Sequence, residues 1–412
     1  MISFCIGGVS SNSGKTILTT ALLYYFKDSV RGYKIGPDFI DPQFHTKISQ
    51  TPSINLDSFI MNKKQVKWIY NNYNTKKVSI LEGVMGFYDG ENKGCSTYGI
   101  SKLLKIPTIL ILDGSGSYIT VSAVLKGILK YKKDNTIKAV VLNNLSSQVH
   151  YELIRNQILK DHKGIVVLGW IKKNLPSLTS THLGLDLKDL SKIEQISKEV
   201  LSNIDIKLLK KTCKIKRKIN KNYPFEKIVP QDKTIAVVND KNFSFLYYDN
   251  LQFLKEKYKK VILIDSTKNE VIPKNVDIVY ICGGYIETNQ AYNRIENNTK
   301  FKNSLIKHSK TKQIYAECAG LLYLGCAVDD KQMSGILDVS FTLKDRFQRL
   351  GYYYNQKGIK GHCFHYTKAL SLQNACDILS KTKNGGGLKG SWKQNKVFGT
   401  YLHTMFRNTK IF

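Results

Sequence analysis

The first half of the chain alternates short apolar stretches with longer stretches in which apolar residues recur every three or four positions. The first pattern predicts buried strands and the second predicts amphipathic helices. The predicted strands are 32–35, 78–81, 108–112, 139–142 and 164–168, and the predicted helices are 63–73, 118–131 and 151–159. Strands that alternate with helices indicate an α/β fold with a doubly wound parallel sheet.

A second alternation of the same kind fills the C-terminal half. It starts with the apolar run 234–238, continues through 260–264, 278–281 and 313–316, and ends with 397–402. Between the two halves, residues 206–231 carry many lysines, two prolines and no strand pattern. The sequence therefore predicts two domains, 1–205 and 232–412, joined by a linker at 206–231.

A glycine-rich segment at 7–16, GGVSSNSGKT, stands between the N-terminal apolar strand and a predicted helix. Strand, glycine-rich turn, Gly-Lys-Thr and helix is the context of a phosphate-binding loop. Backbone N–H groups at the helix start would face a triphosphate, Lys15 would reach its outer phosphates, and Thr16 would hold Mg²⁺. Gly8, Ser13 and Gly14 complete the candidate nucleotide site. Five residues separate Gly8 from Gly14 where the common motif has four, so an ordinary turn is the alternative.

Two other acidic segments follow predicted strands of the same domain. Lys34, Asp38, Asp41 and His45 lie within the twelve residues 34–45, at and after the end of the predicted strand 32–35, a composition that suits Mg²⁺ and phosphate chemistry. Glu82 directly follows another strand, where a carboxylate that holds the metal opposite Thr16 is expected. Thr16, Asp41 and Glu82 are the candidate metal ligands. The alternative is a Pro/Asp turn and an ordinary acid at a strand end.

In the second half, residues 314–324 predict a strand, a sharp turn of small residues and a helix, with Cys318 at the turn. This context is typical of a nucleophile elbow, and a helix N-terminus lowers the pKa of a thiol. Backbone N–H groups of Gly283, Gly284 and Ala319 would form an oxyanion hole. His403, after the last strand, would act as the base. Most lone cysteines are packing residues, which is the alternative.

Composition narrows the protein class. The chain has 412 residues, eight scattered cysteines without a Cys-x-x-Cys pair, and no apolar run long enough to span a bilayer. With a strand at the N-terminus in place of a signal peptide, these features predict a cytoplasmic protein. The net charge of +31 suits an acidic partner, but the lysines are spread along the chain without interleaved aromatics. We therefore expect a small acidic substrate, no nucleic acid and no membrane.

Together these motifs resemble those of the cobyrinate a,c-diamide synthase family, and the resemblance covers nearly all of both halves. The matching segments are 8–16, 36–42, 55–57, 82–86, 182–185, 283–285, 316–320, 361–366 and 401–403. The resemblance implies a dethiobiotin-synthetase-like ATP domain followed by a class I glutamine amidotransferase domain. Cys318 would attack glutamine and His403 would raise the nucleophilicity of its thiol. Met405 stands where other class I glutaminases carry glutamate, which implies a Cys–His dyad.

The resemblance also implies the reaction. ATP with Mg²⁺ would phosphorylate a side-chain carboxylate of a tetrapyrrole polycarboxylate, and ammonia from L-glutamine would replace the phosphate, once at each of two side chains. Lys34 would help to bind the anionic groups. Asp38, Phe39, Ile40 and Asp41 would form a substrate loop, in which the two apolar residues pack on the macrocycle. A homodimer is an open expectation.

The chain departs from the family pattern at several positions. Cys282 and Ala319 replace glycines, and Ile286 replaces a proline, each near the expected oxyanion hole. Thr181 replaces an arginine, which puts an anion contact in doubt. The two histidines and the cysteine of 361–366 offer a metal site, but no fourth ligand is evident.

Other functions fit parts of the sequence. A nickel-sirohydrochlorin a,c-diamide synthase would share nearly all of these motifs and act on a different ring. A cobyrate synthase fits less well, because segment 36–42 looks like that of the diamide enzymes. A ParA/MinD-like ATPase would explain the phosphate loop and the basic charge, but not Cys318 with His403. A non-catalytic binding protein would not explain why Lys15 with Glu82, and Cys318 with His403, are all present.

Overall fold

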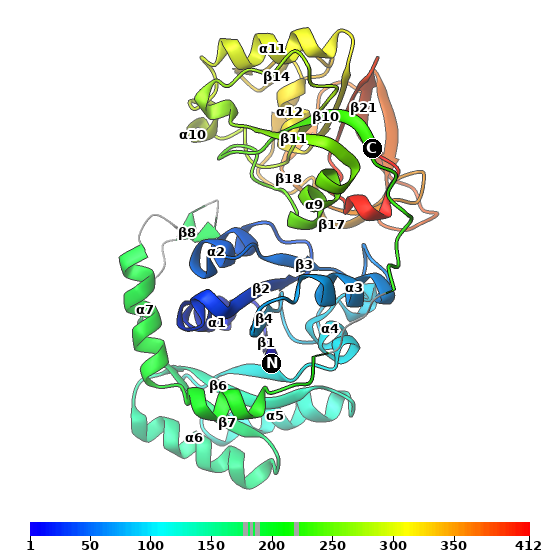
Figure 1. The fold of residues 1–412 in the computed structure, drawn as a ribbon. Helices are drawn as coiled ribbons and strands as arrows, with labels where there is room; N and C mark the ends of the chain where they lie inside the picture. The colour runs from blue at the N-terminus through cyan, green and yellow to red at the C-terminus, as the bar shows by residue number, and fades with distance from the viewer. Residues whose placement is uncertain (176–179, 182–183, 186–189, 218–221) are drawn as a thin grey trace. The chain divides into compact units, whose positions relative to one another are not determined.

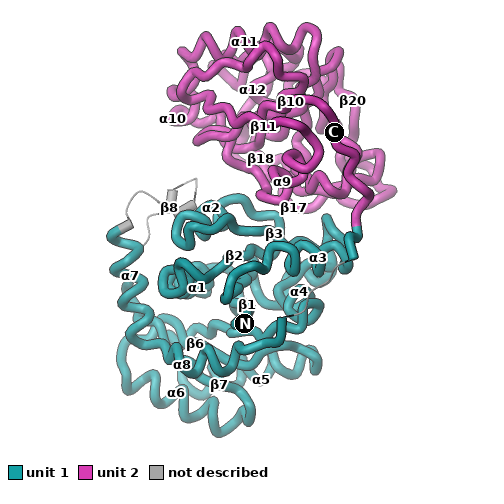
Figure 2. The backbone as a smooth tube through the Cα atoms, in the orientation of Figure 1, with its two compact units in different colours: residues 1–224 teal, residues 225–412 magenta. Residues whose placement is uncertain are grey.

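The computed structural model describes residues 1–175, 180–181, 184–185, 190–217 and 222–412. Two compact units make up the chain, residues 1–224 and 225–412 (Figure 2). The division lies inside segment 206–231, the predicted linker. Helix α8 (Ile206–Thr212) occupies the start of that segment and buries Leu209, and Cys213 directly after it is also buried in the core of the first unit. The first part of the segment therefore belongs to this unit.

A seven-stranded parallel sheet forms the centre of the first unit, in the order β3-β2-β4-β1-β5-β6-β7 (Figure 1). Its strands are β1 (Ile2–Gly8), β2 (Val30–Ile35), β3 (Ile54–Leu56), β4 (Val78–Glu82), β5 (Thr108–Asp113), β6 (Ile137–Leu145) and β7 (Val166–Lys172). A short pair, β8 (Ser180–Thr181) and β9 (Gly184–Leu185), lies outside this sheet. The predicted doubly wound α/β fold is confirmed.

Helices cover both faces of this sheet because side chains of a strand alternate between its faces. In β5, Ile109 and Ile111 pack in a core with α1, α2, α7 and α8, whereas Leu110 and Leu112 pack in a second core with α4, α5 and α6. The helices are α1 (Lys15–Tyr25), α2 (Ile40–Ser49), α3 (Lys63–Tyr73), α4 (Thr97–Leu104), α5 (Ile119–Tyr131), α6 (Gln148–Asp161) and α7 (Leu190–Ser202), with 3-10 turns η1 (Lys27–Ser29) and η2 (Glu91–Lys93). Fully buried strands of this kind read as continuous apolar runs.

The strand order brings three candidate segments to one edge of the sheet. β4 lies between β1 and β2, with Glu82 opposite Ile6 of β1 and opposite Lys34 of β2. The glycine-rich segment 7–16 begins at the end of β1, so Lys34, Glu82 and this segment meet at the carboxyl ends of adjacent parallel strands. Ligands of open α/β sheets bind at this edge.

The second unit also contains a seven-stranded sheet, in the order β11-β10-β12-β13-β22-β21-β20. Its first five strands are parallel, while β21 and β20 add an antiparallel edge that the sequence pattern did not predict. The strands are β10 (Gln231–Val238), β11 (Tyr258–Ile264), β12 (Ile278–Ile281), β13 (Gln313–Glu317), β20 (Ala375–Leu379), β21 (Leu388–Gln394) and β22 (Val397–Thr400).

Smaller elements complete the second unit. The helices are α9 (Tyr248–Lys257), α10 (Asn289–Tyr292), α11 (Thr299–Ser309) and α12 (Ala319–Leu324), with turns η3 (Ser266–Lys268) and η4 (Phe406–Asn408). A four-stranded sheet contains β14 (Ala327–Val328), β15 (Lys331–Gln332), β16 (Phe341–Leu343) and β19 (Thr367–Ala369), and a hairpin contains β17 (Arg349–Tyr354) and β18 (Lys360–His365). In the part of the chain that the structure describes, no helix has the length and apolar character needed to cross a membrane.

Candidate functional site

The glycine-rich segment forms a tight turn between β1 and α1. A side chain at Gly8 would place its Cβ 1.9 Å from Ser13 Oγ, so glycine at this position lets the Ser13 hydroxyl pack against the end of β1. Gly14 caps α1 with a φ of 97°, in the left-handed region. The side chain of Asn143, at the end of β6, donates a 2.9 Å hydrogen bond to the carbonyl of Ser13. Asn143 was not among the predicted residues, because nothing in the local sequence links it to the loop.

Lys15 folds over its own loop and is only 7% exposed. Its Nζ donates to the carbonyl of Ser10 at 2.7 Å and to Ser13 Oγ at 3.5 Å. Burial and the neighbouring charge of Lys34 lower the pKa of Lys15, although nearby carboxylates oppose the shift. Two ammonium groups therefore lie close together at this sheet edge, an arrangement that an anionic group would stabilise.

Glu82 is the centre of a buried polar cluster. Thr16 Oγ1 donates to Glu82 Oε1 at 2.8 Å, and Lys34 Nζ donates to the same oxygen at 3.1 Å. His45 Nε2 lies 2.6 Å from the other carboxylate oxygen. Lys34 also pairs with Asp41. The structure thus brings together the three predicted metal ligands, Thr16, Asp41 and Glu82, but Lys34 lies between the two carboxylates.

The ionisation of this cluster follows from its contacts. Burial opposes the charge of Glu82, but Lys34, His45 and Thr16 outweigh burial and hold the pKa of Glu82 below its usual value. Burial would also lower the pKa of Lys34, but the carboxylates of Glu82, Asp41 and Asp38 raise it. Burial raises the pKa of Asp41 to about 6, with help from Glu82 and against the effect of Lys34.

The predicted substrate loop is partly helical, which corrects the sequence interpretation. Only Asp38 and Phe39 lie in the connection after β2, because α2 begins at Ile40 and includes Asp41 in its first turn. Asp38 Oδ1 accepts a 2.7 Å hydrogen bond from the N–H of Ile40, which fixes the start of the helix. Phe39 is only 8% exposed, whereas Ile40 is half-buried. Ile40 is therefore the more accessible of the two apolar residues.

Cys318 occupies a sharp turn between β13 and α12. Its φ of 46° and ψ of −106° are strained for a residue with a side chain, as a nucleophile elbow requires. The N–H of Cys318 donates to the carbonyl of Thr400 at 2.7 Å, which ties the elbow to β22. The thiol lies 3.9 Å from the carbonyl oxygen of Phe364 in β18.

The ionisation of Cys318 differs from the sequence prediction. The side chain is only 4% exposed, and burial, followed by the nearby Glu287 and Cys363, raises the pKa of its thiol well above the usual value. The short helix α12 does not offset this effect. The thiol is therefore neutral in the resting protein, so its attack requires a base that removes the proton.

His403 provides an imidazole next to the elbow. It is 1% exposed, and a backbone pairing with His362 of β18 holds its position. A side chain at Gly283 would place its Cβ 2.2 Å from His403 Cε1, so the turn after β12 packs directly on the imidazole. Glu317 Oε2 lies 3.3 Å from His403 Nδ1. The remaining ring nitrogen, Nε2, is the atom that can accept a proton.

The other predicted oxyanion residues of this half lie in the turn after β12 and at the start of α12. Gly284 follows Gly283 in the turn after β12, and Ala319 is the first residue of α12, so its N–H has no carbonyl partner within the helix. Met405, at the position of the expected acid, is buried. Among the described residues, no group of three His, Cys, Asp or Glu side chains is arranged to hold a metal ion, including those of 361–366. His182 and Leu183 lie outside the described residues.

Comparisons with known proteins assign the family. The sequence profile of the CobB/CobQ-like glutamine amidotransferase domain matches residues 234–411. The cobyrinate a,c-diamide synthase of Saccharolobus solfataricus is 33% identical over 97% of this chain and 97% of its own. That of Sulfurisphaera tokodaii is 34% identical over 97% of this chain and 96% of its own. A solved glutamine amidotransferase from Thermotoga maritima gives a TM-score of 0.31 at 12% identity, covering 42% of this chain and 76% of that chain.

The relatives agree with the arrangement of the chain. Both synthases match it over nearly their full length, so the similarity includes the unit with the phosphate loop and the unit with Cys318. The match to the amidotransferase domain covers residues 234–411 only and does not by itself identify the reaction of the whole chain. The chain therefore belongs to the cobyrinate a,c-diamide synthase family, and it is a ligase that takes its amide nitrogen from glutamine.

Proposed function

We propose that this protein uses ATP and Mg²⁺ to amidate the a and c side-chain carboxylates of cobyrinate in the cytoplasm, with ammonia from L-glutamine. The observation that carries the proposal is the strained elbow at Cys318, directly after Glu317, whose carboxylate lies 3.3 Å from His403, in a chain that also buries Lys15 in its glycine-rich loop. The names of full-length relatives support the choice of cobyrinate as substrate. The proposed reaction joins glutamine hydrolysis in the second unit to carboxylate activation in the first.

In the second unit, the neutral thiol of Cys318 gives its proton to His403 as sulfur attacks the side-chain amide of glutamine. Backbone N–H groups of Gly284 and Ala319 are the candidate donors to the oxyanion. The C–N bond then breaks, His403 passes the proton to the leaving group, and ammonia departs. Water hydrolyses the remaining thioester to glutamate and restores the thiol.

In the first unit, the contacts fit a nucleotide with a magnesium ion. Lys15 and Lys34 supply positive charge for phosphates, and Thr16 and Glu82 already share a hydrogen bond at the position expected for the metal. One carboxylate and one hydroxyl are a sufficient protein contribution, because Mg²⁺ completes its shell with phosphates and water. When bound, Mg²⁺ would neutralise charge on the phosphates. The substrate carboxylate attacks the γ-phosphorus of ATP, the bond to the bridging oxygen breaks and ADP leaves. Ammonia then attacks the acyl phosphate, loses a proton and displaces phosphate, which leaves the amide.

The proposal is tested by product analysis of the purified protein with ATP, Mg²⁺, glutamine and either cobyrinate or nickel-sirohydrochlorin. We expect mono- and diamide of cobyrinate by mass spectrometry, with ADP formed for each amide. If diamide forms from nickel-sirohydrochlorin but not from cobyrinate, the protein is instead a nickel-sirohydrochlorin a,c-diamide synthase. ATP hydrolysis that needs neither macrocycle nor glutamine would favour a ParA/MinD-like ATPase.

A substitution of the nucleophile tests the division of labour. Cys318→Ser should abolish amidation with glutamine but keep amidation with ammonium, because the thiol only releases ammonia. Cys376→Ser is the matched control, since Cys376 is an exposed cysteine of the same unit. Loss of ammonium-driven synthesis in a folded Cys318→Ser protein would contradict the proposed division.

A further inference from the structure

Glu317, the residue directly before the nucleophile, lies in a polar cluster that the reaction described above does not use. Glu317 is only 1% exposed, and its two carboxylate oxygens have separate partners. Tyr280 OH donates to Oε2 and Tyr315 OH donates to Oε1, each at 3.0 Å. His403 Nδ1 lies 3.3 Å from Oε2. A buried carboxylate is costly unless hydrogen bonds stabilise it, and here three donor groups surround it.

The sheet explains why these groups meet. Tyr315 and Glu317 are two residues apart in β13, so their side chains lie on the same face. Tyr280 of β12 is paired in register with Tyr315, which places the second hydroxyl on that face. His403 follows β22, the strand on the other side of β13. Three adjacent parallel strands thus aim their polar groups at one carboxylate.

We infer that Glu317 is the positioning residue of His403, which means that its carboxylate orients the imidazole. Met405, at the position of the glutamate of other class I glutaminases, has no carboxylate for this role. A carboxylate at Nδ1 fixes the tautomer that carries its hydrogen on Nδ1, so that Nε2 is the nitrogen that accepts the proton of Cys318. It also stabilises the imidazolium that forms while the proton is held. Glu317 itself gains no proton. The inference rests on the proposed function where it concerns the later use of ammonia. The reaction of the Cys318 thiol with glutamine can be tested without that function.

The need for such a group follows from the burial of the nucleophile. The pKa of the Cys318 thiol is raised, so the resting protein holds a neutral thiol rather than a thiolate. Proton transfer to His403 then creates a charge in a buried site, where an unpaired imidazolium is unfavourable. Glu317 supplies the opposite charge on the far side of the ring. The two tyrosine hydroxyls hold the carboxylate in place.

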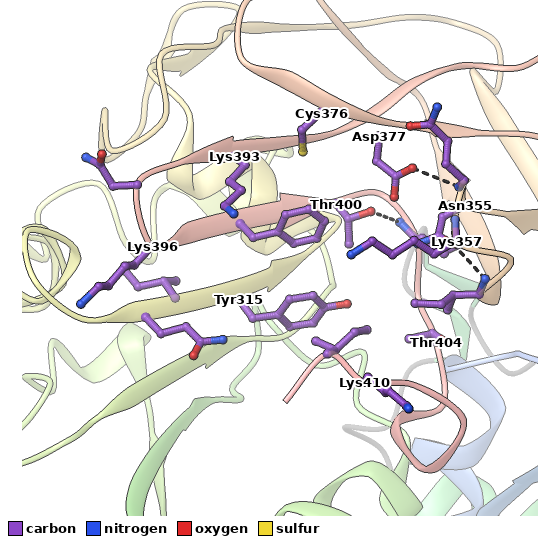
Figure 3. Close-up of a pocket in the computed structure, with 18 residues that line it drawn as sticks. Tyr315, Asn355, Lys357, Cys376, Asp377, Lys393, Lys396, Thr400, Thr404 and Lys410 are labelled. Carbon is purple, nitrogen blue, oxygen red and sulfur yellow. Dashed lines mark hydrogen bonds between the residues drawn. The ribbon is translucent and has the colours of Figure 1, made fainter.

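Tyr315 also connects this cluster to a cavity of about 740 Å³ in the second unit. The cavity is lined by Tyr315, Thr400 and Thr404, together with exposed lysines such as Lys357 and Lys393 (Figure 3). A substitution of Tyr315 therefore changes both the cavity and the contacts of Glu317. Tyr280, which is 0% exposed and does not line the cavity, is the cleaner probe of the carboxylate.

The test is the pH dependence of Cys318 alkylation by 6-diazo-5-oxo-L-norleucine, a reactive glutamine analogue. Loss of the unmodified Cys318 peptide is followed by mass spectrometry, so neither ATP nor a macrocycle is required. Glu317→Gln should slow alkylation at neutral pH on the order of 100-fold. It should also move the acidic limb of the pH profile to lower pH, because the neutral amide no longer stabilises the imidazolium of His403.

The control variant is Glu296→Gln, the same change at an exposed position of the second unit. It should leave both the rate and the limb unchanged. Ammonium-driven amidation by Glu317→Gln should equal that of the wild type. Failure of the wild type to amidate any macrocycle would contradict the proposed function alone, since alkylation reports on the thiol by itself.

An unchanged acidic limb in folded Glu317→Gln would overturn the inference and leave Glu317 as a structural residue. If this variant does not fold, Tyr280→Phe decides, because it keeps the ring and removes one donor from the carboxylate. More negative charge then faces His403, so the limb should move to higher pH. The absence of any shift in Tyr280→Phe would equally overturn the inference.

Discussion

The hydroxyl of Thr16 donates a 2.8 Å hydrogen bond to Glu82 Oε1, which joins the first turn of α1 to the end of β4. The two residues are 66 positions apart in the sequence, and the parallel pairing of β1 with β4 brings them together. The same carboxylate oxygen accepts from Lys34. A single buried acid therefore links the phosphate loop to the segment that is proposed to meet the substrate.

Removing the loop ammonium should stop nucleotide chemistry. Lys15→Ala should reduce ADP formation at least about 100-fold with either glutamine or ammonium, because Lys15 would stabilise charge on the transferred phosphoryl group. The readout is ADP release in the presence of cobyrinate. Lys126→Ala, an exposed lysine of α5, should retain full activity. Wild-type ADP formation by Lys15→Ala would show that the loop is an ordinary turn.

Glu82→Gln should affect stability as well as activity. Glu82 is buried against Lys34 and His45, and loss of its charge leaves Lys34 without one of its anionic partners. Removal of one partner from a buried ion pair costs about 3–5 kcal/mol, although Asp41 still pairs with Lys34 and reduces this cost. The thermal unfolding midpoint should fall, and more Mg²⁺ should be needed for half-maximal synthesis. Glu152→Gln, at an exposed position, is the control. A Mg²⁺ requirement equal to that of the wild type would remove Glu82 from the metal site.

Asp41 should impose a pH dependence on the first unit. Its pKa is raised to about 6, chiefly by burial. The carboxylate is therefore protonated below pH 6 and ionised above it, so synthesis that needs its charge should increase through pH 6. The assay uses ammonium at a constant concentration of free NH₃, so that the nitrogen source does not vary with pH. The step should disappear in Asp41→Asn. A wild-type profile that is flat between pH 5 and 7 would argue against a charged role for Asp41.

The regular elements of the chain could be predicted because their signals are local. The helix predicted at 63–73 matches α3 residue for residue, and the strand predicted at 278–281 matches β12. The apolar runs of buried parallel strands are distinctive, as are the glycine turn at Lys15 and the small residues around Cys318. In contrast, β20 is short, partly exposed and interrupted by Asp377, and β21 is mostly polar, so no long apolar run identifies them.

The partners of the site residues could not be predicted because they depend on contacts between distant segments. Glu317 was recognised only as part of a motif, since its role is visible only when Tyr280 and His403 are placed beside it. The start of α2 at Ile40 was missed because Gly36, Pro37 and Asp38 indicate a turn. The raised pKa of Cys318 was missed because burial depends on the whole fold.

The two apolar residues near the start of α2 should give different phenotypes. Phe39 is nearly buried, so Phe39→Ala should lower the free energy of unfolding by about 3 kcal/mol through the cavity it leaves. Ile40 is half-buried, so Ile40→Ala should retain stability and change the ratio of mono- to diamide after limited turnover. Ile119→Ala, at an exposed position of α5, is the matched control. Equal product ratios in Ile40→Ala and the wild type would mean that Ile40 does not contact the substrate.

The packing of Gly283 on His403 offers a test that leaves all reacting groups in place. In Gly283→Ala, the added Cβ would lie 2.2 Å from His403 Cε1, closer than non-bonded carbons can approach, so the imidazole must move. Because His403 must be close to the thiol to accept its proton, glutamine-driven synthesis should fall at least about tenfold. A small displacement of a catalytic group is enough to cause a loss of this size.

The same variant should keep ammonium-driven synthesis, since its defect is confined to the second unit. Gly386→Ala is the matched control, because no atom lies within 4 Å of the Cβ that it would add. The two activities are measured in parallel as diamide formed with glutamine and with ammonium. Equal losses of both in Gly283→Ala would indicate a general folding defect, which circular dichroism would detect. Retention of both at the wild-type level would mean that the turn after β12 yields to the methyl group, and that contact with Gly283 does not fix the imidazole.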